Sequence, residues 1–135
     1  MSALKTTHIG YTTYRGSGHW SFILHRLTGL GTLLFLGIHI LDTATVYFIP
    51  QLYEEAINLY RNPLFMLGEI GLVFCLFFHG LNGLRIAIFD LFMPGKWNIE
   101  TQRKSALWIL GIAIILWIPA AFMMGRALLV HNFGL

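Results

Sequence analysis

The chain has 135 residues, of which 56% are hydrophobic and only 11% are charged. A soluble domain carries about 25% charged residues. The composition therefore excludes an ordinary soluble domain and indicates one domain whose apolar surface lies in lipid. Nine Lys and Arg against six Asp and Glu give a net charge of +3. The basic residues are scattered at the ends of apolar runs rather than clustered, so we do not predict nucleic-acid binding.

A polar segment, residues 1–19, opens the chain and lacks the apolar core of a signal peptide. Three apolar runs follow, at about residues 20–41, 64–89 and 106–130. Each is long enough to cross a bilayer as a helix, which takes about 20 residues. We therefore predict an all-α integral membrane protein, with the N-terminal segment followed by a three-helix transmembrane domain, residues 20–135.

The loop between the first two spans has its own helical pattern. Leu52, Ala56 and Tyr60 recur every four residues, which predicts a short helix on the membrane surface. Asn62 and Pro63 follow, and they are typical of an N-cap and the first position of a helix. The second span is therefore expected to begin there.

Lys and Arg concentrate in two segments outside the spans, the N-terminal segment and residues 91–105. Their basic residues are Lys5, Arg15, Lys96, Arg103 and Lys104. The loop of residues 42–63 holds only Arg61. The positive-inside rule therefore predicts a multi-pass protein of the inner or cytoplasmic membrane with its N-terminus in the cytoplasm or matrix.

The second span contains His79, Gly83 and Arg85 and ends near Asp90. Ionisable groups within a span are costly and usually mark function. Gly83 shares a helix face with His79 and leaves a flat slot that suits a porphyrin edge. Neutral imidazole is a common heme ligand, and Arg85, about 9 Å further along, could pair with a propionate or a lipid phosphate. A histidine hydrogen-bonded to a neighbouring helix is the alternative.

In the first span, His25, Gly29 and His39 lie on one stripe, and Arg26 follows His25. Gly29 keeps that face thin, so that a neighbouring helix or a cofactor can approach. His25 and Arg26, near the predicted inner interface, can donate hydrogen bonds to carboxylates such as heme propionates, or to a quinone carbonyl. Arg26 could equally extend to lipid headgroups.

Two runs of residues, His25-Arg26-x-Thr28-Gly29 and His79-x-x-x-Gly83-Leu84-Arg85 with Asp90 beyond it, resemble the membrane-anchoring cytochrome b subunit of succinate dehydrogenase. The resemblance covers most of the chain, including the three helices and the inward N-terminus. It implies that His79 is an axial ligand of heme b.

The same resemblance implies that His25 and Arg26 lie around the heme propionates and the ubiquinone or menaquinone pocket, with Trp20 nearby and Asp90 at the inner end of the second helix. Members of the family often place a serine four residues before this arginine. Here Ser21 precedes Arg26 by five residues, a turn of about 140°. We therefore do not expect Ser21 and Arg26 to face the same ligand.

His39 raises the question of a second heme, because some relatives with two hemes use a histidine near the outer end of the first helix. If Arg26 and Asp90 share a level, His39 lies about 20 Å below Arg26 and His79 about 16 Å below Asp90. The two histidines would then differ little in depth, which is awkward for two separate hemes. His39 is kept as a second candidate ligand behind His79.

Members of the family form half of a heme-binding bundle with a second membrane anchor that supplies the other axial histidine. They work with a flavoprotein and an iron–sulfur subunit. This chain has no dinucleotide fingerprint and no cysteine cluster, so FAD and iron–sulfur clusters are expected in those partners. The expected function is a heme b- and quinone-binding anchor that passes electrons from succinate to the quinone pool and is not catalytic alone. Alternatives are a fumarate reductase anchor, a heme b anchor of another respiratory dehydrogenase, and a heme-free structural anchor.

Overall fold

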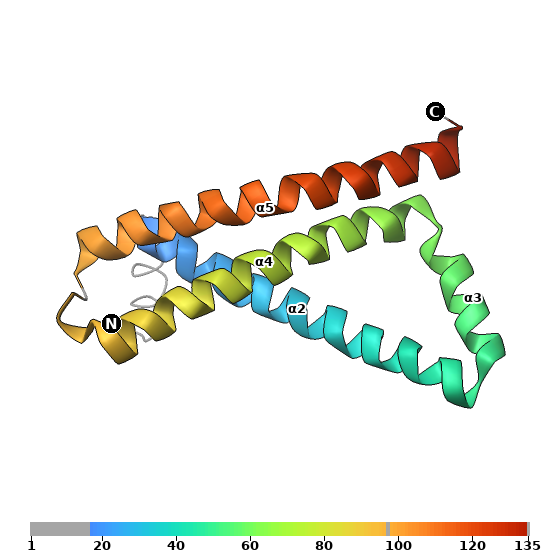
Figure 1. The fold of residues 1–135 in the computed structure, drawn as a ribbon, viewed down its shortest axis with the longest axis horizontal. Coiled ribbons are helices and arrows are strands. Elements are labelled where there is room, and N and C mark those ends of the chain that lie inside the picture. Colours follow the sequence, from blue (N-terminus) through green and yellow to red (C-terminus); the bar gives the residue numbers. More distant parts are fainter. Residues whose placement is uncertain (1–16, 97, 135) are drawn as a thin grey trace, which may run out of the picture.

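The computed structural model describes residues 17–96 and 98–134, and this part of the chain contains helices and short connections but no strand. Three long helices run antiparallel to their neighbours in sequence (Figure 1), namely α2 (Ser17–Phe48), α4 (Pro63–Phe92) and α5 (Ile99–Phe133). The short helix α3 (Pro50–Tyr60) joins α2 to α4, and the 3-10 turn η1 (Pro94–Lys96) joins α4 to α5. Helix α4 is central, since it packs against both α2 and α5.

The prediction of an all-α membrane protein with three spans is confirmed. The segments long and apolar enough to cross a membrane are His19–Phe48, Pro63–Phe92 and Ile99–Asn132. Each helix is longer than the apolar run predicted from the sequence. The reason is that polar residues at its ends also adopt the helical conformation. Most of the predicted N-terminal segment, including Lys5 and Arg15, lies outside the described residues.

The ends of the helices follow from local capping. The side chain of Asn62 accepts a hydrogen bond from the Leu64 N–H at 3.0 Å, with Pro63 at the first position, as predicted. Asn98 caps α5 in the same way and accepts from the Thr101 N–H at 2.8 Å. Gly134 ends α5 at a φ of 68°, a left-handed conformation that favours glycine.

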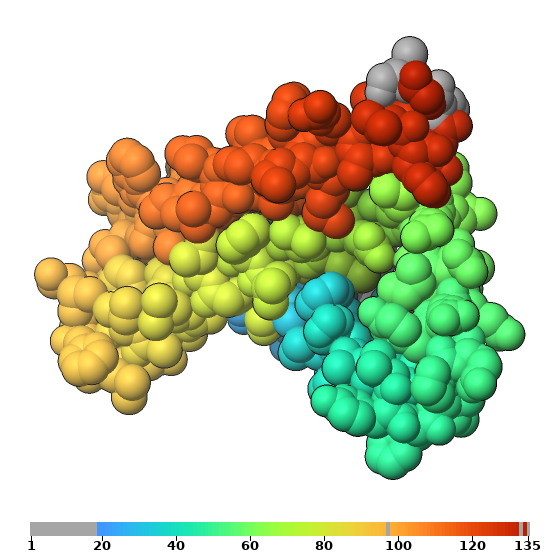
Figure 2. Space-filling view, turned by 45° about the vertical axis from the view of Figure 1, so that its right-hand side comes forward, coloured from blue at the N-terminus to red at the C-terminus, as the bar shows by residue number. Residues whose placement is uncertain are grey.

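Helices α2 and α4 are in contact near the middle and diverge toward α3, which forms the third side of a triangle (Figure 1). The space-filling view in Figure 2 shows α3 beside the adjoining ends of α2 and α4, with α5 along the upper edge. The short helix predicted between the first two spans is thus confirmed. Its Ala56 and Tyr60 are partly buried, whereas Leu52 is exposed.

Helix α3 is fastened to α2 by a hydrogen bond from the Tyr60 hydroxyl to the Asp42 carboxylate. This bond, together with partial desolvation and the nearby negative charges of Asp42 and Glu69, raises the pKa of Tyr60 to about 12. Because only the protonated phenol donates, the contact is fully present below pH 10, the ordinary pKa of tyrosine, and is lost as the pH rises through about 12.

We expect Tyr60→Phe to loosen α3, because the substitution removes the hydrogen-bond donor and little else. Amide hydrogen exchange in Pro50–Tyr60 should become faster than in the wild type, with the long helices unchanged. Tyr53→Phe is the matched control, a tyrosine of the same helix with no hydrogen bond of its hydroxyl among the described residues. In an optical titration, the absorbance step removed by Tyr60→Phe should lie near pH 12. A step near pH 10, or equal exchange in the two variants, would contradict the role of this bond.

Candidate functional site

His25 of α2 and His79 of α4 meet where the two helices touch. Their ring centroids lie 4.2 Å apart and their planes differ by 8°. The Nδ1 atom of His79 lies 3.0 Å from the backbone carbonyl oxygen of His25. A carbonyl oxygen only accepts, so Nδ1 carries the proton and Nε2 keeps its lone pair. Among the described residues, Nε2 of His79 has no hydrogen-bond partner.

Glycines allow this close approach. A Cβ at Gly29 would lie 2.8 Å from Cε1 of His79, nearer than side chains come to one another. Gly31 likewise receives Cys75, whose Sγ would lie 2.8 Å from such a Cβ. Gly83, predicted to open a slot beside His79, instead faces His25, whose Cε1 would lie 3.7 Å from an added Cβ. The contact is therefore a ring-to-backbone approach across the two helices.

The register of α2 against α4 differs from the one assumed when the depths of His39 and His79 were compared. His79 lies level with Gly29, and Arg26 lies one turn away from Gly29. Asp90 lies eleven residues beyond His79, about 16 Å along the helix. Measured along the helices from the contact of Gly29 with His79, Asp90 therefore lies much further out than Arg26, and the two residues do not share a level. His39, ten residues beyond Gly29, lies about 15 Å from the level of His79, so depth no longer argues against a separate site there.

The structure separates Arg26 from the histidine pair. His25 is partly buried in the helix contact, whereas Arg26 is exposed. The Arg26 guanidinium lies over the ring of Phe22, 4.2 Å from its centroid. Asp90 is also exposed, near the η1 end of α4. Any ligand shared by His25 and Arg26 would have to reach around α2.

Arg85 turns away from His79 and toward α5. Its Nη1 donates to the Gln102 carbonyl at 3.2 Å and to the Ser105 hydroxyl at 3.3 Å. Nearby, Asn82 is 1% exposed. Its Oδ1, the Nε of Arg85 and the Nε2 of Gln102 are buried without partners among the described residues. This polar contact was not predicted from the sequence, although Gln102 and Ser105, three residues apart on the next helix, were the available signal.

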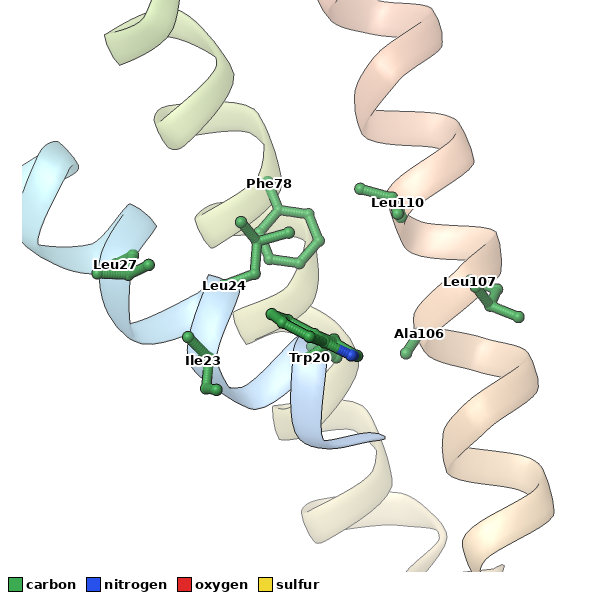
Figure 3. Close-up of a pocket in the computed structure, with 9 residues that line it drawn as sticks. Trp20, Ile23, Leu24, Leu27, Phe78, Ala106, Leu107 and Leu110 are labelled. Carbon is green, nitrogen blue, oxygen red and sulfur yellow. The ribbon is translucent and has the colours of Figure 1, made fainter. Parts of the chain in front are cut away.

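An apolar hollow of about 370 Å³ lies beside the first turns of α2, between α2, α4 and α5 (Figure 3). Trp20 and Ser21, both predicted near the quinone, line it with Phe78 of α4 and Ala106 of α5. Its other walls are Ile23, Leu24, Leu27, Leu107 and Leu110. Arg26 is not among the lining residues, in accord with the expectation that Ser21 and Arg26 face different directions.

A second hollow, of about 390 Å³, lies between α2, α3 and α4 at the opposite end. Its polar lining residues include His39, Asp42, Tyr60 and Glu69. The His39 ring stacks on Phe35, with centroids 5.7 Å apart. His39 thus belongs to a different part of the molecule from the pair formed by His25 and His79. Among the described residues, no group of three or more His, Cys, Asp or Glu side chains could hold a metal ion.

The contact of Arg85 with α5 predicts an energetic coupling between Arg85 and Ser105. In a double-mutant cycle, Arg85→Met and Ser105→Ala should be non-additive by about 0.5–1.5 kcal/mol in the free energy of unfolding in detergent. Thr43 lies at the far end of α2, so Arg85→Met and Thr43→Ala should be additive. Additivity of the first pair would show that the Arg85 side chain does not join the two helices.

Comparison with known proteins gives a consistent answer. Residues 5–120 match the model of the family described as the succinate dehydrogenase/fumarate reductase transmembrane subunit. The chain is 36% identical over 116 residues to the succinate dehydrogenase 2 membrane subunit SdhC of Mycobacterium tuberculosis, which covers 84% of this chain and 82% of that protein. It is 29% identical over 114 residues to the succinate dehydrogenase hydrophobic membrane anchor subunit of Halobacterium salinarum, covering 82% and 85%. The chain, with its three spans and its paired histidines, belongs to the succinate dehydrogenase/fumarate reductase transmembrane-subunit family.

Proposed function

We propose that this membrane subunit of succinate dehydrogenase binds heme b through His79 and forms part of a quinone pocket, so that electrons from succinate oxidation reach the membrane quinone pool. The observation that carries the proposal is the setting of His79. One ring nitrogen is held by a backbone carbonyl, and the other has no hydrogen-bond partner among the described residues.

The residues present fit a heme. Histidines that bind a metal through one ring nitrogen almost always donate the other N–H to a carbonyl or carboxylate, and Nδ1 of His79 does so. The ring is only partly buried, so a porphyrin held between this chain and a second anchor subunit could reach Nε2. The Nδ1 of His25 is buried beside His79 and has no partner among the described residues, so it would hydrogen-bond a propionate only if the His25 side chain turned outward. Bound heme b would supply a centre that takes up and releases single electrons.

The apolar hollow beside the start of α2 supports the quinone part of the proposal. Trp20 and Ser21 contribute to its wall, and an apolar cavity with few polar groups suits a quinone ring and tail. Arg26 does not line this hollow but is exposed at the same end of α2, so its guanidinium would stabilise negative charge on the oxygen of a quinone whose head reaches out of the hollow. Asp90 lies near the η1 end of α4, where it would exchange protons with the aqueous phase.

The remaining parts of the proposal concern orientation and partners. We place the N-terminus and the connection between α4 and α5 on the cytoplasmic side of the cell membrane, because these segments hold most of the Lys and Arg outside the spans. A flavoprotein with FAD and an iron–sulfur subunit would dock there. The same chain would serve a fumarate reductase if the potential of the quinone favoured the reverse reaction, and the family description includes both enzymes.

The heme proposal predicts that His79→Ala, made in the complete complex, removes the reduced-minus-oxidised absorbance band of a b-type heme. Loss of Nε2 removes an axial ligand, so the heme-to-protein ratio should fall at least severalfold. His131→Ala, at the exposed end of α5, is the control and should leave the band intact. His39→Ala tests the second candidate ligand and should reduce heme content only if His39 holds a second heme. An unchanged band in His79→Ala would refute ligation by His79, and a wild-type complex without a Soret band would indicate a heme-free anchor.

The quinone proposal predicts that Arg26→Gln lowers quinone reduction by succinate about ten- to a hundredfold, since the positive charge that stabilises the developing negative charge is removed. Succinate oxidation with a water-soluble acceptor should remain unchanged, because the flavoprotein is not altered. Arg126→Gln, an arginine in the last third of α5, is the matched control and should affect neither rate. Equal quinone reduction in Arg26→Gln and the wild type would exclude Arg26 from the pocket.

A further inference from the structure

We infer that residues 25–29 of α2 form an orienting support for His79, in which the His25 carbonyl and the missing side chain of Gly29 together fix the tautomer and tilt of the imidazole and so set how strongly its Nε2 donates to a metal. The inference rests on the proposed heme function and deepens it. The proposed function makes His79 a ligand, and the inference states which groups of this chain tune that ligand.

The first component is the backbone carbonyl of His25. It can only accept a hydrogen bond, and it lies 3.0 Å from Nδ1 of His79. The tautomer with the proton on Nε2 would place two lone pairs against each other, so it is excluded while this contact lasts. The Thr28 hydroxyl, in a residue 2% exposed, lies 3.1 Å from the same oxygen and 2.7 Å from the Leu24 carbonyl. The acceptor is thus held in place from its own helix.

The second component is the notch at Gly29. An added Cβ would lie 2.8 Å from Cε1 and 3.1 Å from Nδ1 of His79, but 3.7 Å from Nε2. The Cε1–Nδ1 edge of the ring, which carries the proton, therefore faces α2. Of these three ring atoms, the proposed ligand atom Nε2 lies furthest from the backbone at Gly29. Any side chain at this position would push the ring away from the carbonyl and break the bond at Nδ1.

The third component is the ring of His25, which stacks on His79 at 4.2 Å with nearly parallel planes. It limits rotation of His79 about its side-chain bonds. Gly83 of α4 lies beside this ring, and an added Cβ there would be in ordinary van der Waals contact with Cε1 of His25, at 3.7 Å. The His79 ring is thus enclosed by the His25 ring, the backbone at Gly29 and the His25 carbonyl. It cannot rotate by 180° without losing the hydrogen bond of its Nδ1.

The chemical consequence concerns the electron density at Nε2. Donation of the Nδ1 proton to a carbonyl makes an imidazole a stronger base and a stronger ligand. A stronger donor favours ferric over ferrous iron and lowers the midpoint potential of a heme. The support on α2 should therefore hold the heme potential below the value that an unanchored histidine would give.

The test compares two alanine substitutions of the same size in the purified complete complex. Gly29→Ala places its Cβ against His79, whereas Gly31→Ala, two residues further on, places its Cβ at the same 2.8 Å from the Sγ of Cys75. Both strain the contact between α2 and α4, but only the first displaces the imidazole. Gly37→Ala, which meets nothing within 4 Å among its described surroundings, serves as the unstrained control.

We expect Gly29→Ala to shift the heme midpoint potential in the positive direction and to change the low-spin electron paramagnetic resonance signal, or to lower heme occupancy severalfold. Gly31→Ala and Gly37→Ala should keep the wild-type potential and occupancy, although Gly31→Ala is expected to lower thermal stability. The inference is overturned if Gly29→Ala keeps the wild-type potential and signal, or if Gly31→Ala alters them to the same extent, since general strain would then explain both.

A second experiment tests the hydrogen bond without altering α2. In His79→Gly, free imidazole and 1-methylimidazole are supplied as replacement ligands; both can bind iron, but the methylated ring has no N–H to donate. Imidazole should restore the wild-type potential, and 1-methylimidazole should give a more positive one. Equal potentials with the two ligands would overturn the inference while leaving ligation by residue 79 intact. A native heme spectrum in His79→Gly without any added ligand would instead refute the proposed function.

Discussion

The close approach of two helices at Gly29 and His79 is the constraint on which the arrangement of the molecule depends. Within lipid, helices gain little from hydrophobic association, so small residues and polar contacts decide where they meet. Gly29 lets the imidazole of His79 reach the backbone of α2. Together with the equally close approach of Gly31 to Cys75, this contact sets α2 against α4, and the hollow near Trp20 and the hollow near His39 lie at opposite ends of the pair.

Two different faces of helix α4 contact two different helices, α2 and α5. The side with His79 and Gly83 meets α2. The side with Arg85 meets the first turns of α5. Further along, the indole N–H of Trp117 in α5 donates to an α4 carbonyl at 2.9 Å. Polar groups that would be costly in lipid, such as the Arg85 guanidinium and the Trp117 indole N–H, are therefore directed between helices.

Much of the fold could be predicted from the sequence, because apolar length and capping residues such as Asn62 are local signals. His79 could be singled out as a candidate because a histidine within a span needs a reason. Its contact with His25 could not be predicted, since that contact depends on the register of two helices, and helix periodicity says nothing about register. The same limit explains why the sequence could only assume a common level for Arg26 and Asp90, which the structure does not show, and why the contact of Arg85 with α5 was missed.

Few side chains of the described chain are buried, and the largest that are fully enclosed are Phe78 and Asn82. The hollow beside α3 is lined by two partly buried carboxyl groups, Asp42, which accepts from the Tyr60 hydroxyl, and Glu69. Because an ionised carboxylate is costly in lipid, α3 lowers that cost by giving Asp42 a hydroxyl donor where α2 ends.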